Sequence, residues 1–267
     1  KKALFEKEAS NNTAVGSNAL DTNTTGAQNT ALGVSALYAN TTAAYNVAIG
    51  YRALNANTTG TQNTAVGSFA LEDITTASYC TAIGYNGLRN NAGANNTACG
   101  YATLQDNTTG YNNTAVGYYA LVTNTTGYNN TAVGYESLQA NLANNNTGFG
   151  RRAGKNITTG TETVAVGQGA LETCTTSSNN TAVGCNALNV STAGNSTAIG
   201  QNALGSNTSG VRNTGCGFQV LNTNQTGGSN TAMGYSALYS NTGDGNSGFG
   251  NDALKSNSSG EKNTALG

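Results

Sequence analysis

Apolar residues recur along this chain at a fixed phase relative to a repeated glycine, which we call the anchor. Successive anchors are separated by 16 or 17 residues from one end of the chain to the other. A fixed short period is typical of repeat proteins in which each unit packs only against its neighbours. The anchors are Gly16, Gly33, Gly50, Gly67, Gly84, Gly100, Gly117, Gly134, Gly150, Gly167, Gly184, Gly200, Gly217, Gly234, Gly250 and Gly267.

Two apolar positions in each repeat are candidates for the core. The residue before the anchor is always apolar, as in Val116, and the residue four after it is Leu in every repeat but one, where Gly154 stands. We expect both positions to form the core. The residue two before the anchor, as in Ala115, is always Ala or Gly. A position that is always small predicts a close approach of backbones.

The local pattern favours strands and turns over helices. The segment 113–116, Asn-Thr-Ala-Val, alternates polar and apolar residues as a short strand does, and Gly117 is expected to form a corner. The next two residues of the core pattern, Ala120 and Leu121, predict a second short strand or a bend. The segment 124–127, Asn-Thr-Thr-Gly, has turn chemistry. No apolar stripe has helical spacing, so the sequence predicts an all-β β-solenoid of about 16 coils, each of 16–17 residues.

The repeat phase extends over the whole chain. Residues 1–267 are therefore expected to form a single continuous solenoid array, with residues 1–15 as a divergent first coil. The last coil, residues 263–267, lacks the atypical polar cap that solenoids usually carry. Two explanations stay open: a segment of a longer array, or a subunit that stacks end to end on the next copy.

Charge and composition exclude several classes of partner. The net charge is only −1, which gives no electrostatic basis for binding nucleic acid or an anionic membrane. No apolar run approaches the roughly 20 residues that span a bilayer, so membrane insertion is not expected. The chain begins at Lys1 without an initiator Met, which weakly favours a processed, secreted protein. We therefore expect an extracellular, cell-surface or virion-surface location.

Catalytic chemistry is not expected. The chain has no His, so Ser-His and Cys-His pairs are impossible, and its carboxylates lie at varying phases. Its five cysteines form no Cys-x-x-Cys motif, and none shares a phase with a cysteine one coil away. We predict neither an enzyme nor a bound cofactor or metal, and we expect Cys99 and Cys216 to behave as small core residues.

Asparagines recur at two positions in the repeat. The residue four before most anchors, as in Asn113, is expected to form a ladder of stacked amides. The turn contains Asn-x-Ser/Thr motifs, which are candidate N-glycosylation sites in a secreted protein. The candidate sites are Asn23, Asn40, Asn57, Asn107, Asn124, Asn207 and Asn257.

Tyrosine often follows the anchor. Tyr101, Tyr118 and Tyr135 stand in consecutive repeats, with Arg151 next in line, and predict an aromatic strip. One interpretation is that ring contacts stabilise one face of the solenoid. The other is that the strip binds glycans or a protein partner.

Threonine stands three before most anchors, and a regular threonine array suggests ice binding. This residue shares strand parity with the expected core residue before the anchor. We therefore expect it to point inward, which makes ice binding the third hypothesis.

The motif Asn-Thr-Ala-Val-Gly-x-x-Ala-Leu resembles two groups of repeats. One is the head repeat of YadA-like trimeric autotransporter adhesins, and the other is the Thr-Ala-x-Gly-x-x-Ala-Leu repeat of phage tail fibres and bacterial surface proteins. The resemblance extends over all repeats and implies an extracellular β-roll fibre, often trimeric, used for attachment. The period here is longer than the roughly 14 residues of the adhesin heads.

Taken together, these observations favour a structural subunit of an extracellular fibre that associates with itself, head to tail or laterally, with glycosylation as an option. The alternatives are the shaft or head of an adhesin or phage fibre that binds surface glycans, and an ice-binding solenoid.

Overall fold

The computed structural model of the chain describes residues 10–267. Residues 1–9 of the predicted divergent first coil lie outside the described residues. Within residues 10–267 the chain forms sixteen strands of three residues each and no helix. The chain divides into two compact units, residues 1–130 and 131–267, and each is described by itself.

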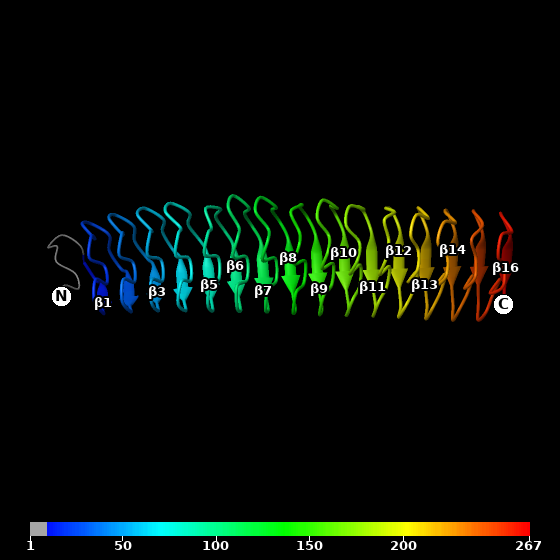
Figure 1. The fold of residues 1–267 in the computed structure, drawn as a ribbon, viewed down its shortest axis with the longest axis horizontal. Helices are drawn as coiled ribbons and strands as arrows, with labels where there is room; N and C mark the ends of the chain where they lie inside the picture. The colour runs from blue at the N-terminus through cyan, green and yellow to red at the C-terminus, as the bar shows by residue number, and fades with distance from the viewer. Residues whose placement is uncertain (1–9) are drawn as a thin grey trace. The chain divides into compact units, whose positions relative to one another are not determined.

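The first unit contains seven strands, each paired in parallel with the next along the chain. They are β1 (Thr13–Val15), β2 (Thr30–Leu32), β3 (Val47–Ile49), β4 (Thr64–Val66), β5 (Thr81–Ile83), β6 (Thr97–Cys99) and β7 (Thr114–Val116). The register keeps equivalent repeat positions side by side, as Ala82 is paired with Ala98. Figure 1 shows these arrows pointing the same way in consecutive coils.

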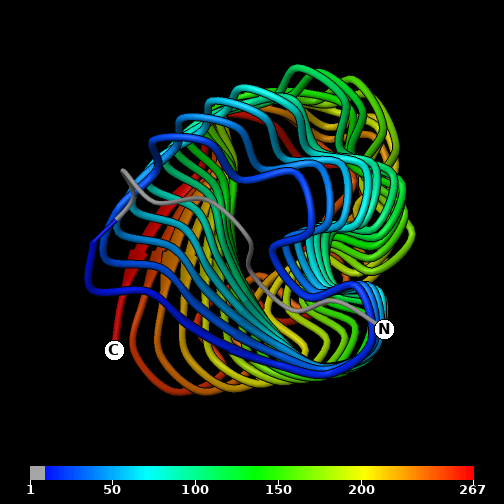
Figure 2. The ribbon, with the colours of Figure 1, turned by 90° about the vertical axis from the view of Figure 1, so that its left-hand side faces the viewer.

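The second unit repeats this arrangement with nine parallel strands. They are β8 (Thr131–Val133), β9 (Thr147–Phe149), β10 (Val164–Val166), β11 (Thr181–Val183), β12 (Thr197–Ile199), β13 (Thr214–Cys216), β14 (Thr231–Met233), β15 (Ser247–Phe249) and β16 (Thr264–Leu266). The prediction of an all-β solenoid is confirmed. Seen from the end in Figure 2, each coil is a loop that folds back on itself around its core.

The core differs from the prediction at one of its two apolar positions. Leu at the fourth residue after the anchor is fully buried, as predicted, from Leu20 to Leu238. The residue before the anchor is not in the core, since Ile83 is 44% exposed and Phe149 is 55% exposed. The buried residue of each strand is instead the small one two before the anchor, such as Ala82. Cys99 and Cys216, expected in the core, lie on the outer face and are half-buried.

Strand parity explains why the small residue is buried and the larger one is exposed. Successive side chains of a strand point to opposite faces, so Ala in the middle of the three-residue strand excludes both its neighbours from the interior. The opposite wall of the thin coil already supplies Leu and a second Ala, such as Leu71 and Ala70. Only a methyl group fits between them, because a core packed to native density does not accept extra methylenes without strain.

The corner after each strand is built from left-handed backbone conformations at residues other than glycine. The second and fourth residues after the anchor have positive φ, as in Asn86 (56°) and Leu88 (50°). Backbone N–H groups there donate in opposite directions: Asn86 to Ser68 of the coil before, at 3.2 Å, and Leu88 to Thr103 of the coil after, at 3.0 Å. These hydrogen bonds and the burial of Leu offset the cost of the left-handed conformation.

The anchor glycine is required by both conformation and space. Gly84 has φ of 127°, a region that residues with a side chain rarely adopt. A Cβ at this position would collide with the carbonyl oxygen of the next anchor, Gly100. The predicted glycine corner is confirmed, and its cause is the close stacking of successive anchors.

Candidate functional site

The outer face of the parallel sheet carries two side-chain columns on each unit, and we call it the sheet face. Its apolar column consists of the residue before the anchor in each repeat, and all these residues are exposed or half-exposed. On the first unit the column consists of Val15, Leu32, Ile49, Val66, Ile83, Cys99 and Val116. On the second it consists of Val133, Phe149, Val166, Val183, Ile199, Cys216, Met233, Phe249 and Leu266.

The second column of the sheet face is mainly threonine. Contrary to the expectation that threonine points inward, residues such as Thr97 and Thr114 are exposed. Valine stands in this column at Val47 and Val164, and serine at Ser247. The strands of residues 10–267 contain no charged residue, so the sheet face has an apolar column and a hydroxyl column without formal charge. Sequence reasoning missed this surface because it assigned one column to the core.

The aromatic strip is present within the first unit. The rings of Tyr85, Tyr101 and Tyr118 stack at centroid distances of 5.3 and 5.2 Å with interplanar angles of 12° and 13°. Stacked rings cover one another's flat faces, which are the surfaces that a sugar ring would contact. The strip therefore fits the stabilising interpretation better than the glycan-binding one.

Tyr135 belongs to the second unit. The guanidinium of Arg151 lies 6.0 Å from its ring centroid, at the outer limit of a cation–π contact. A hydrogen bond with Glu136 raises the pKa of the Tyr135 hydroxyl. The predicted neighbourhood of Tyr135 and Arg151 is thus found.

The turn asparagines proposed as glycosylation sites have a structural role. The side chains of Asn23, Asn40, Asn57, Asn107, Asn124 and Asn207 are buried, and Asn257 is half-buried. The Nδ2 of Asn124 donates to the Gly127 carbonyl at 3.0 Å and to Oδ1 of Asn107 at 3.0 Å. A glycan attached to these amide nitrogens would prevent the coil from closing, so the folded structure argues against modification at the buried sites.

The asparagines four residues before the anchor are stacked as predicted, but their amides bond mainly to backbone groups of adjacent coils and less to one another. Asn113 is buried, its Nδ2 donates to the Gly127 carbonyl at 2.8 Å, and its backbone N–H donates to Oδ1 of Asn96 at 2.9 Å. Each amide thus satisfies backbone groups of the neighbouring coil. Both asparagine columns thus supply hydrogen-bond partners to buried backbone groups, which an all-apolar core would leave unpaired.

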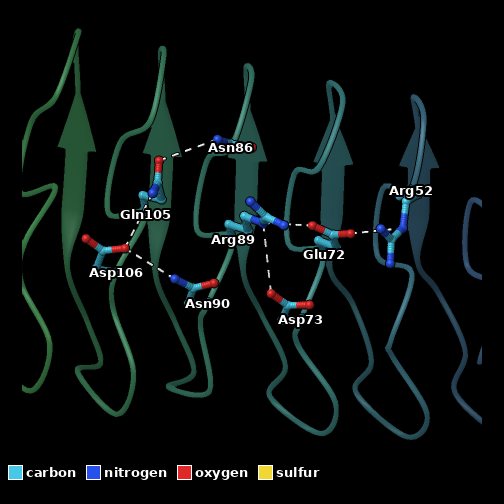
Figure 3. Close-up of polar contacts among 8 residues, drawn as sticks. All are labelled: Arg52, Glu72, Asp73, Asn86, Arg89, Asn90, Gln105 and Asp106. Carbon is cyan, nitrogen blue, oxygen red and sulfur yellow. Dashed lines mark hydrogen bonds and ion pairs between the residues drawn. The ribbon is translucent and has the colours of Figure 1, made fainter.

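A polar face lies on the far side of the corner, where the second and fifth residues after the anchor meet. In the first unit Glu72 is 1% exposed and lies between two arginines (Figure 3). The Nε of Arg89 donates to it at 2.7 Å, while the Nε of Arg52 lies 2.9 Å away as an ion pair without hydrogen-bond alignment. Arg89 also lies above the Phe69 ring at 5.3 Å.

The second unit has a similar charged group on this face. Glu136 accepts hydrogen bonds from Lys155 at 2.6 Å and from Arg152 at 3.1 Å. Desolvation raises the pKa of Glu136, but the hydrogen bonds from Lys155, Tyr135 and Arg152 outweigh it, and the pKa is lowered. These groups connect successive coils, as expected of structural ion pairs.

The cysteines show no sign of activation. Cys80 and Cys174 are buried, and desolvation raises the pKa of both thiols. A raised pKa disfavours the thiolate, which is the nucleophile and metal ligand. All five cysteines are free thiols.

In the described part of the chain, no three His, Cys, Asp or Glu side chains gather closely enough to hold a metal ion. Residues 10–267 also contain no helix with the length and apolarity needed to cross a bilayer. Searches against protein-family models and curated proteins found no match to this chain. The resemblance to YadA-like heads and phage-fibre repeats therefore stays a prediction from the repeat motif.

Proposed function

We propose that this protein is a structural subunit of an extracellular fibre and that its coils associate laterally with other copies through the sheet face. The observation that supports this proposal most directly is the apolar column that strand parity directs outward. Soluble proteins rarely expose contiguous apolar surface without a partner. The column continues through every strand of each unit.

A second copy of the chain is the partner that this surface fits best. Because the face has no formal charge, two copies can approach without like-charge repulsion. Both copies also repeat with the strand spacing of about 4.8 Å, so apolar residues of one can meet those of the other at every coil. Association would remove side chains such as Ile83 and Phe149 from water, which is favourable by roughly 25 cal/mol per Å² of apolar surface.

The test introduces like charges on the sheet face and measures assembly. The double substitution Ile83→Lys and Val116→Lys places two cations in the apolar column of the first unit. The control, Thr59→Lys and Thr109→Lys, adds the same charge at exposed turn positions. Sedimentation velocity should show multimers for the natural chain and the control and monomers for the sheet-face variant, with unchanged circular dichroism.

A natural chain that sediments as a monomer, and appears in electron micrographs as single short particles, would contradict the proposal. Filaments in the same micrographs would support the fibre role and distinguish end-to-end stacking from lateral bundles. End-to-end stacking itself stays a prediction from the repeat phase.

Ice binding is the second candidate, and the outward direction of the threonines favours it. Thr97 and Thr114 are consecutive members of a hydroxyl column with the fixed spacing of a parallel sheet. Such a column can order water at regular intervals beside apolar side chains. We expect the natural chain to show thermal hysteresis and the double variant Thr97→Lys with Thr114→Lys to lose it. A natural chain without thermal hysteresis would reject ice binding.

A further inference from the structure

The polar face of the second unit contains a hollow between three successive coils. Its volume is about 400 Å³. We call it the amide pocket; its lining includes Asn186, Asn189, Asn202, Gly205, Gln219 and Asn222. This volume lies within the range of roughly 300–1,000 Å³ found for small-molecule sites.

The pocket exists because Gly205 has no side chain at the fifth position after the anchor. Other coils place larger residues at this position, including Glu72, Arg89 and Gln105. The neighbouring coils contribute Asn189 and Asn222 at the same position, so the missing side chain leaves a gap between two amides. A Cβ at Gly205 would lie 3.1 Å from Nδ2 of Asn222, which shows that the gap borders this amide directly.

Hydrogen bonds hold two of the lining amides in place. The Nδ2 of Asn189 donates to the Gly169 carbonyl at 2.8 Å, and the Nδ2 of Asn222 donates to the Asn202 carbonyl at 2.8 Å. Within residues 10–267 neither Oδ1 accepts a hydrogen bond, and the side chains of Asn202 and Gln219 make none. The pocket thus combines oriented acceptors with amides that can both donate and accept.

This donor set selects a class of ligand. No charged residue lines the pocket, whereas phosphate and carboxylate groups are typically held by Arg or Lys, and Mg²⁺ or Ca²⁺ by carboxylates. Neutral hydroxyl groups both donate and accept, as amides do. We propose that the amide pocket binds a neutral saccharide of one or two rings, independently of how the protein assembles.

Saturation-transfer difference NMR on the full chain tests this proposal with glucose, galactose, mannose and N-acetylglucosamine as separate probes. N-acetylneuraminic acid serves as the anionic comparison. We expect saturable binding of at least one neutral sugar, with a dissociation constant on the order of millimolar. Absence of binding by all four sugars, or equal binding of the anionic sugar, would overturn the proposal.

The variant Gly205→Gln fills the pocket. Because Gln105 and Gln139 occupy the equivalent position in other coils, this substitution is compatible with the fold. It should weaken the sugar signal at least about tenfold, as expected when a site loses its space and paired groups. Asn202→Ser introduces the residue that Ser35 and Ser236 place at the same repeat position. It removes one amide without filling the space and should weaken binding less.

The control Asn251→Gln lies on an exposed position of another coil and should bind as the natural chain does. Circular dichroism confirms that each variant is folded. Binding by folded Gly205→Gln that equals the natural chain would place the sugar elsewhere and reject the amide pocket.

Discussion

Ala82 and Ile83 are consecutive residues of strand β5, yet they lie on opposite faces of the sheet. Ala82 is fully buried, whereas Ile83 is 44% exposed. The smaller of the two side chains is the core residue, and the larger one belongs to the sheet face. This relationship recurs in the other strands and determines which surface is available for association.

The first prediction tests this assignment by changing volume at both positions. Ala82→Leu should destabilise the protein by about 1–3 kcal/mol, because it overpacks a site between two coils. Ile83→Ala, which removes more atoms from an exposed position, should cost less than about 1 kcal/mol in the monomer. Urea unfolding followed by circular dichroism measures both, at a protein concentration at which sedimentation velocity shows monomers. The reverse order of effects would show that Ile83 is the core residue.

The second prediction concerns the turn ladder. Asn107→Ala should cost about 1–3 kcal/mol, because it removes the donor to the Gly110 carbonyl, 2.8 Å away, and leaves buried acceptors unpaired. Asn90→Ala in an adjacent coil, where the amide is exposed, should change stability by no more than about 0.5 kcal/mol. Equal effects of the two substitutions would mean that the buried ladder does not stabilise the coil.

The third prediction concerns Glu72 and its arginines. Glu72→Gln should destabilise the protein by about 1–3 kcal/mol. This cost is below that of breaking a fully buried ion pair, because the two arginine side chains are 38–41% exposed and can be hydrated when the carboxylate is lost. In a double-mutant cycle, Glu72→Gln should couple to Arg89→Gln more strongly than to Arg52→Gln, because only the Arg89 contact is an aligned hydrogen bond. Equal coupling energies would contradict this difference.

The fourth prediction follows from Glu136, whose pKa is lowered in the folded state. A lowered pKa contributes stability above the unfolded value of 4.5 and loses it as pH falls through the lower folded value. The natural chain should therefore lose stability between about pH 5 and pH 3 more steeply than Glu136→Gln does. Unfolding free energies measured across this range check the slope, and identical pH profiles would exclude a contribution from Glu136.

The regular part of the fold was predictable from local chemistry. The glycine period, the turn residues and the absence of helical spacing predict stacked β coils, and the leucine four after the anchor is buried as expected. The stacking of the asparagines before the strand was also predicted correctly, although their amides bond mainly to backbone groups. These features depend on one repeat and its immediate neighbours, so repetition makes them visible in the sequence.

The candidate surfaces were harder to predict from the sequence. Residues with positive φ, such as Leu88, have no local signal, because leucine disfavours that conformation and adopts it only under hydrogen bonds from adjacent coils. The amide pocket results from Gly205 lying between two asparagines that are distant in the chain. Such juxtapositions arise from stacking alone.

The sequence by itself determined the coil period, the parallel strands and one wall of the core, because each follows from the pattern within a repeat. Only the tertiary structure decided which side chains of the three-residue strand face the core and which face outward. The space opposite Leu accepts Ala and not Val or Ile, and strand parity then directs the larger residue and the threonine outward. The turn asparagines, suited by motif to carry sugar, are buried because their amides bond to the carbonyl of their own turn and to the asparagine of the neighbouring coil.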